Sequence, residues 1–78
     1  MDSNRPINIK CWEKFLESIG CKYVSTESSH AKWKCPGCIR SIFHRITKKE
    51  IPSFHIKSNL KTIGVSPSDF YLWVEENC

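Results

Sequence analysis

Apolar and polar residues alternate strictly over positions 30–35, and this alternation constrains the fold more than any other feature of the sequence. A period of two is typical of a strand with one buried and one solvated face. The buried face would carry Ala31, Trp33 and Cys35, and the opposite face would carry His30, Lys32 and Lys34. A histidine in line with two lysines suits a polyanion such as RNA, because a group that titrates near neutral pH lies beside fixed positive charge. A solvated strand face that happens to be basic is the alternative.

The length of 78 residues predicts a single domain over 1–78, with room for one sheet and two or three helices. No apolar run approaches the roughly 20 residues of a membrane span. The start of the chain lacks the apolar core of a signal peptide. We therefore expect no membrane contact and a cytoplasmic location. In that compartment, five cysteines favour free thiols or a metal site over a disulfide framework.

Positive charge is concentrated in the middle of the chain. The net charge is +4, but residues 22–61 hold nine basic residues against two acidic ones. We expect a nucleic-acid backbone to bind this segment, although a charged run is also typical of a solvated surface. Besides the two strand lysines, the candidate RNA contacts are Ser29, Arg45, Lys48 and Lys49.

The first helix signal follows a leader over 1–7 that we expect to be loose. Asn8 is a suitable N-cap, and the apolar residues after it recur with the period of a helix over 9–19. Gly20 can adopt the left-handed conformation that ends such a helix.

Two more helices are predicted near the C-terminus. Ser53 is a suitable cap for the first, which Gly64 would end. Ser66 followed by Pro67 is a typical start for the second. The expected core comprises Trp12, Phe15, Leu16, Ile19, Trp33, Leu60, Phe70 and Trp73.

Strands are predicted over 22–26, 30–35 and 39–46, and they would form an antiparallel sheet. His44 falls on the apolar face of the last strand, so we expect it to be a half-buried structural residue. The element order is α-β-β-β-α-α. This order predicts an α+β fold whose helices cover one face of a three-stranded antiparallel sheet and leave the other face free. The same arrangement occurs in double-stranded-RNA-binding domains.

The segment Cys35-Pro36-Gly37-Cys38 allows three interpretations. Proline followed by glycine suits a type II turn at the tip of a hairpin, and this plain turn is favoured. A zinc site would use Cys35, Cys38 and His44 but needs a fourth ligand from a distant cysteine. A redox disulfide would require the pair to open a helix after a strand. We therefore expect no metal or other cofactor.

The chain resembles the HicA family of small toxin ribonucleases from about Cys11 to Glu76. Ser28-Ser29-His30 stands where the family has Gly-Ser-His, followed here too by a short strand. Leu60-Lys61-Thr62-Ile63-Gly64-Val65-Ser66, followed by Phe70, is similar to the family's closing pattern of a helix, a Gly-Ile-Ser turn and a Phe-bearing helix.

This resemblance implies a protein with a double-stranded-RNA-binding-like fold that cleaves mRNA without a metal. A HicB-like antitoxin would hold this protein inactive. The resemblance also implies that His30 is the catalytic histidine, with the role of general acid or base. Lys32 and Lys34 could then hold the phosphate and stabilise its developing charge. A non-catalytic RNA-binding module of the same fold is the alternative.

Overall fold

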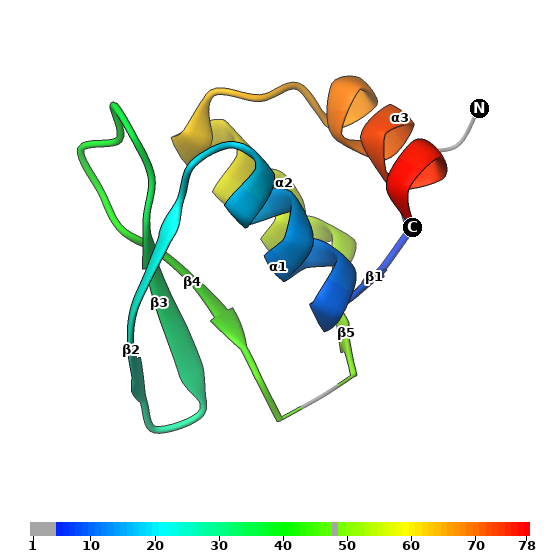
Figure 1. Ribbon diagram of the computed structural model, residues 1–78. Helices are drawn as coiled ribbons and strands as arrows, with labels where there is room; N and C mark the ends of the chain where they lie inside the picture. The colour runs from blue at the N-terminus through cyan, green and yellow to red at the C-terminus, as the bar shows by residue number, and fades with distance from the viewer. Residues whose placement is uncertain (1–4, 48) are drawn as a thin grey trace.

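The computed structural model of the protein describes residues 5–47 and 49–78. Strands and helices follow one another in the predicted order, with one additional short strand before the first helix and another before the second (Figure 1). The elements are β1 (Ile7–Asn8), α1 (Ile9–Ser18), β2 (Lys22–Glu27), β3 (His30–Lys34), β4 (Ile42–Arg45), β5 (Glu50–Ile51), α2 (Ser53–Ile63) and α3 (Pro67–Asn77).

The main sheet is antiparallel with the strand order β2-β3-β4. α1 and α2 lie on one side of it, and α3 packs beyond them (Figure 1). Within the part of the chain that the structure describes, no helix covers the other face of the sheet. The structure therefore confirms the α+β fold with helices on one face of a three-stranded sheet.

A second, two-stranded pairing joins β1 to β5, with Ile7 opposite Ile51. Both isoleucines are buried. Ile7 was expected in a loose leader, and this expectation was wrong because its side chain contributes to the core. The first four residues of that leader lie outside the described residues.

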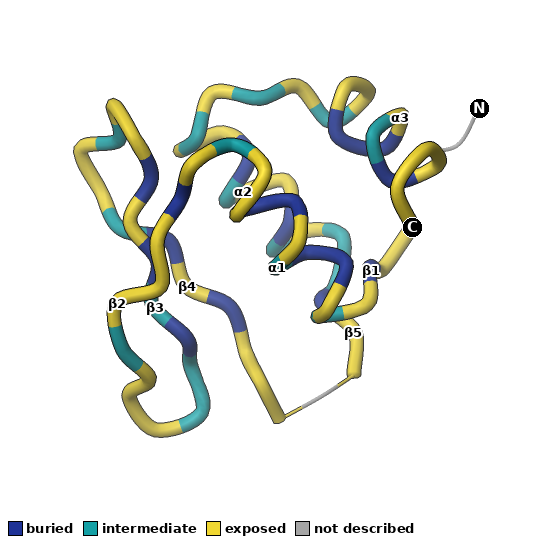
Figure 2. Tube along the Cα trace, viewed as in Figure 1, coloured by how far each residue is buried: buried dark blue, intermediate teal, exposed yellow. Residues whose placement is uncertain are grey.

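The core is formed between the helices and the inner side of the sheet (Figure 2). Phe15 and Phe70 pack edge to face with ring centroids 4.7 Å apart, and Trp12 lies 5.3 Å from Phe70. Tyr71 is buried as well, and its hydroxyl donates a hydrogen bond of 2.7 Å to the Arg5 carbonyl. Of the eight expected core residues, Trp12, Phe15, Leu16, Trp33, Leu60 and Phe70 are buried, whereas Ile19 and Trp73 pack at its margin.

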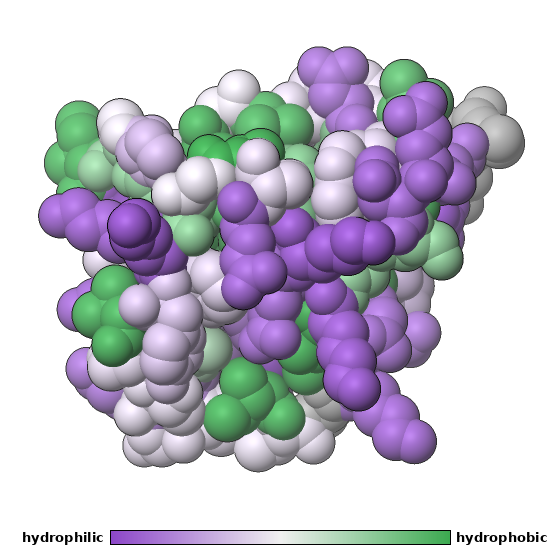
Figure 3. All heavy atoms as spheres, viewed as in Figure 1, coloured by the Kyte–Doolittle hydropathy of each residue, from purple (hydrophilic) through white to green (hydrophobic). Residues whose placement is uncertain are grey.

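Hydrophilic side chains cover the solvent side of α1 in the view of Figure 3, as expected for a helix with one apolar stripe. Its N-cap is Asn8, whose side chain accepts a hydrogen bond of 2.8 Å from the Lys10 amide. Ser66 caps α3 in the same way by accepting from the Asp69 amide at 3.2 Å. Both predicted caps are confirmed.

α2 differs from its prediction at the start. Gly64 ends the helix with a left-handed φ of 91°, as expected. Pro52, and not Ser53, is the N-cap residue, and no side chain caps the helix. Proline fixes the extended backbone that an N-cap needs, so the helix can begin without a side-chain cap.

Four of the five cysteines form disulfides, which corrects the expectation of free thiols or a metal site. Cys11 is bonded to Cys78 with a Cα–Cα distance of 6.1 Å, and Cys21 to Cys35 with 4.0 Å. Cys21 precedes β2 and Cys35 follows β3. These positions meet because β2 and β3 are antiparallel neighbours. In the described part of the chain, no helix is long and apolar enough to cross a membrane.

Candidate functional site

The face of the sheet that carries no helix is called the outer face here. Along β3, Ala31 and Trp33 are buried under the helices, whereas Lys32 and His30 are half-buried and Lys34 is exposed. The predicted division of this strand is therefore confirmed. The strand register assigns these side chains to the outer face: Lys22, Ser25 and Glu27 from β2, His30, Lys32 and Lys34 from β3, and Phe43 and Arg45 from β4.

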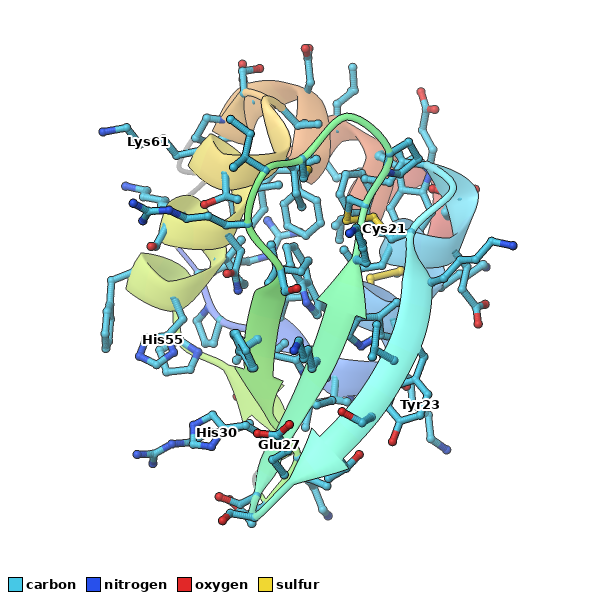
Figure 4. The ribbon with its side chains drawn as sticks, turned by 90° about the vertical axis from the view of Figure 1, so that its left-hand side faces the viewer. Cys21, Tyr23, Glu27, His30, His55 and Lys61 are labelled. Carbon is cyan, nitrogen blue, oxygen red and sulfur yellow. A yellow bond between two sulfur atoms is a disulfide. The ribbon has the colours of Figure 1, made fainter. Side chains whose placement is uncertain are left out.

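The first row of the outer face contains an acid, a histidine and an arginine. His30 is paired with Glu27 on one side and with Arg45 on the other. Directly opposed residues on neighbouring strands have Cβ atoms about 5 Å apart, so both charged side chains flank the imidazole. Figure 4 shows His30 at one end of the sheet, extending toward the side on which His55 of α2 lies. In the register of the sheet, His30 thus lies between an acidic residue and an arginine.

The second row is centred on Lys32, which lies between Ser25 and Phe43. The Lys32 Nζ atom lies over the Phe43 ring, 6.0 Å from its centroid. This cation–π contact holds the ammonium group on the outer face. The Phe43 side chain remains 43% exposed beside it, so the row presents a positive charge and an aromatic surface together.

The third row pairs Lys34 with Lys22, a contact that the sequence did not predict. β2 contains a register shift between Tyr23 and Ser25. This bulge adds one residue to β2, so the side chains before it point to the opposite faces from those that strict alternation would give. Lys22 consequently joins the basic outer face, whereas Tyr23 packs against the Trp33 ring with centroids 5.9 Å apart. A strict alternation along β2 would have assigned Lys22 to the other face.

The turn before β3 sets the position of His30, the first residue of that strand. Ser28 has a left-handed φ of 57°, a conformation that glycine adopts without strain. Ser29 is half-buried, and its carbonyl accepts a hydrogen bond of 2.9 Å from the Ile46 amide. The turn is therefore tied to the strand that carries Arg45.

His44 lies on the opposite side of the sheet, paired with Ala31. Its side chain is fully buried, and the Trp33 Nε1 group donates a hydrogen bond of 3.1 Å to its Nε2. Nδ1 lies 3.3 Å from the Arg45 carbonyl, so Nδ1 carries the proton. Burial lowers the pKa of His44, and the nearby Arg45 carbonyl and Glu13 only partly oppose this. His44 is a structural histidine, as predicted, although it is fully rather than half buried.

The remaining basic candidates are not all on this face. Arg45 is exposed in the first row, next to His30. Lys49 instead lies on the connection after β4, where its carbonyl accepts a hydrogen bond of 2.9 Å from the Ile9 amide. Its side chain lines a hollow with Asn8 at the start of α1. Lys48 lies outside the described residues.

The zinc alternative for Cys35, Cys38 and His44 is contradicted. The Cys35 sulfur is bonded to Cys21, and the Cys38 thiol lies 3.7 Å from the Thr62 carbonyl. Residues 5–47 and 49–78 contain no group of three or more potential metal ligands. Gly37 has a φ of 74°, and the Cys38 amide donates to the Cys35 carbonyl at 3.2 Å. These values fit the predicted type II turn.

Comparison with protein-family models gives a match to the family described as "HicA toxin of bacterial toxin-antitoxin" over residues 11–65. The matched segment contains the whole three-stranded sheet, including His30, and ends just before α3. No curated protein and no solved structure matches the chain. The match covers well over half of the 78 residues and confirms the resemblance of the chain to this family. The chain therefore belongs to the HicA family of toxins of toxin–antitoxin systems.

Proposed function

We propose that this toxin is an endoribonuclease that cleaves mRNA without a metal, with His30 as the residue that transfers protons. One observation carries the proposal, which is the row of Glu27, His30 and Arg45 across the open face of the sheet. The row puts a histidine beside both an acid and an arginine, a residue type that suits phosphate, on the face that no helix of residues 5–47 and 49–78 covers.

Metal-free RNA cleavage needs a base that takes the 2′-hydroxyl proton, an acid that protonates the leaving oxygen, and positive charge near the phosphate. A histidine can fill either proton role, typically for about 10²–10⁴-fold in rate. Arg45 and Lys32 lie next to His30 across and along the sheet, where they would hold the phosphate and stabilise its added charge. We expect Glu27, which is paired with His30 in the sheet, to orient the imidazole in the manner of a base held by a carboxylate.

The basic surface extends beyond the reacting phosphate through Lys22 and Lys34. We expect both lysines and Ser29 to bind the RNA backbone. Lys49 would contact RNA only beyond the sheet, because it lies on the connection after β4. Backbone contacts of this kind contribute affinity and not sequence preference. The strength of binding should therefore fall as salt rises.

Membership of the family implies a cognate antitoxin. We propose a HicB-like protein whose acidic groups meet the basic outer face and cover His30. Opposite charges on two partners mainly accelerate their association. The toxin would act in the cytoplasm, where mRNA is translated.

The decisive experiment incubates the purified protein with a long RNA in EDTA, beside a His30→Ala variant. We expect the wild type to cleave and the variant to be at least 100-fold slower, because the remaining charges can bind RNA but cannot move its protons. RNA binding by the variant should change little. Cleavage and the arrest of growth on expression should disappear together.

Lys61→Gln is the matched control, since Lys61 lies on α2 far from His30 in Figure 4. It removes one positive charge and should leave cleavage unchanged. Full cleavage by a folded His30→Ala protein would remove His30 from the mechanism. RNA binding without cleavage by the wild type would instead support the non-catalytic module.

A further inference from the structure

We propose that the hollow between β4 and α2 binds one unpaired nucleobase of the RNA strand whose phosphate lies at His30. This inference rests on the proposed function and names the part of the substrate that the outer face holds beside the reacting phosphate. The hollow has a volume of about 290 Å³ and is lined by Phe43, Phe54, His55, Ser58 and Asn59.

Two aromatic rings from different elements are exposed at this hollow. Phe43 on β4 is 43% exposed, and Phe54 on α2 is 68% exposed. The His55 ring packs edge to face against Phe54, with centroids 4.4 Å apart. Exposed aromatic rings at a concave site are typical of surfaces on which unpaired bases stack, because every base has a flat π face.

The hollow also offers hydrogen-bonding groups for the edge of a base. Asn59 donates a hydrogen bond of 3.0 Å from Nδ2 to the Phe43 carbonyl. This contact fixes the amide and leaves its Oδ1 as an acceptor for an amino or imino group of a base. Ser58 and His55 supply further polar atoms on the same wall. An apolar anchor of a protein partner would leave these polar groups without partners, so the set fits a base better.

The position of the hollow relative to His30 supports the same occupant. Phe43 is two residues from Arg45 on the same face of β4, which corresponds to about 7 Å along a strand. Arg45 is paired with His30, and Lys32 lies over the Phe43 ring. Among the described residues, no acidic side chain lines the hollow. A strand with its phosphate between His30 and Arg45 can therefore place the adjoining base against Phe43, with Lys32 beside it.

The test compares two oligomers of equal charge, eight linked uridines and eight linked abasic ribose phosphates, bound to His30→Ala protein so that nothing is cleaved. We expect the uridine oligomer to bind about 10-fold more tightly, as base stacking on one aromatic site allows. Phe54→Ser and Phe43→Val should each remove most of this difference and leave the affinity for the abasic oligomer unchanged. Leu72→Ser is the matched control, because Leu72 is an exposed apolar residue on α3.

The outcomes separate this inference from the proposed function. A preference for uridine that both phenylalanine variants retain would overturn the nucleobase site while RNA binding stands. Loss of antitoxin binding, with the uridine preference unchanged, would show that the hollow binds protein instead. Failure of the His30→Ala protein with both phenylalanines intact to bind either oligomer would overturn the proposed function itself, and this inference with it. Phe54→Ser keeps the test valid if Phe43→Val fails to fold, because Phe54 is largely exposed on a helix.

Discussion

Ser28 stands where the Gly-Ser-His pattern that this segment resembles has glycine, and its backbone conformation is unfavourable for a residue with a side chain. Its φ of 57° is in the left-handed region, where a residue with a Cβ atom is disfavoured by about 1–2 kcal/mol. We predict that Ser28→Gly raises the free energy of unfolding by about 1 kcal/mol, part of the relief being offset by the flexibility of glycine when unfolded. Urea unfolding measures this change.

Ser29→Gly is the control for this substitution. Ser29 is the neighbouring serine, and its φ is not positive. Ser29→Gly should be neutral or destabilising. Equal effects of Ser28→Gly and Ser29→Gly on the free energy of unfolding would show that the strain at Ser28 does not limit stability. A stabilised Ser28→Gly protein that cleaves faster would further indicate that the strained turn misplaces His30.

His44 makes the stability of the fold depend on pH. Burial lowers its pKa in the folded protein, whereas the pKa of an unfolded histidine is about 6.5. Between these two pKa values, the unfolded chain binds more protons than the folded protein. His44 therefore does not lower the free energy of unfolding above about pH 6.5, but lowers it increasingly as the pH drops toward the folded pKa. Urea midpoints at pH 8 and pH 5.5 should therefore differ, with the lower midpoint at acid pH.

The control for this dependence is His44→Phe. It removes the titrating group but also the acceptor of the Trp33 hydrogen bond, so it should be less stable at both pH values and less sensitive to acid. An unchanged pH dependence in His44→Phe would assign the effect to another group.

At the scale of elements, the features set by neighbouring residues could be predicted from the sequence. The caps at Asn8 and Ser66, the end of α2 at Gly64 and the two faces of β3 each depend on a few adjacent residues. The position of His30 on the outer face follows from the same alternation. Local signals of this kind are readable because the interactions behind them span a turn or a strand.

The features that join distant parts of the chain could not be predicted in this way. The pairing of Ile7 with Ile51 involves strands of two residues, which have no periodic pattern. The bulge in β2 depends on its register with β3, and without it Lys22 could not be assigned to the site. Phe54 and His55 reach the candidate site only because α2 packs along β4. The cysteine pairs could not be predicted, because an expected cytoplasmic location argues against disulfides and the sequence does not give the distances between cysteines in the fold.

At the scale of the whole molecule, the two disulfides close loops of very different length. Cys11 and Cys78 are separated by 67 positions, and Cys21 and Cys35 by 14. The chain-entropy estimate is about 4 kcal/mol for the longer loop and about 3 kcal/mol for the shorter one. These contributions are large beside the total stability of a small domain, typically about 5–15 kcal/mol.

We therefore predict that reduction by dithiothreitol, or the substitution Cys11→Ser with Cys78→Ser, lowers the free energy of unfolding by several kcal/mol. Thermal and urea unfolding with and without reductant measure the effect. Cys38→Ser is the control, because Cys38 is the free cysteine of the described residues and its loss should leave unfolding unchanged. Equal stability of the oxidised and reduced proteins would contradict the prediction.

The bulge in β2 and the hydrogen bond from Asn59 to Phe43 have a joint consequence for assembly. An unprotected edge strand can pair with a strand of another chain, by which proteins aggregate or add a partner's strand to their own sheet. Here the bulge interrupts the regular row of amides along β2. At the other edge, the Asn59 side chain already occupies the Phe43 carbonyl of β4. Neither edge thus presents an uninterrupted row of free backbone groups for strand addition. We therefore expect a protein partner that meets the sheet to do so on its outer face, the face on which we propose that RNA binds.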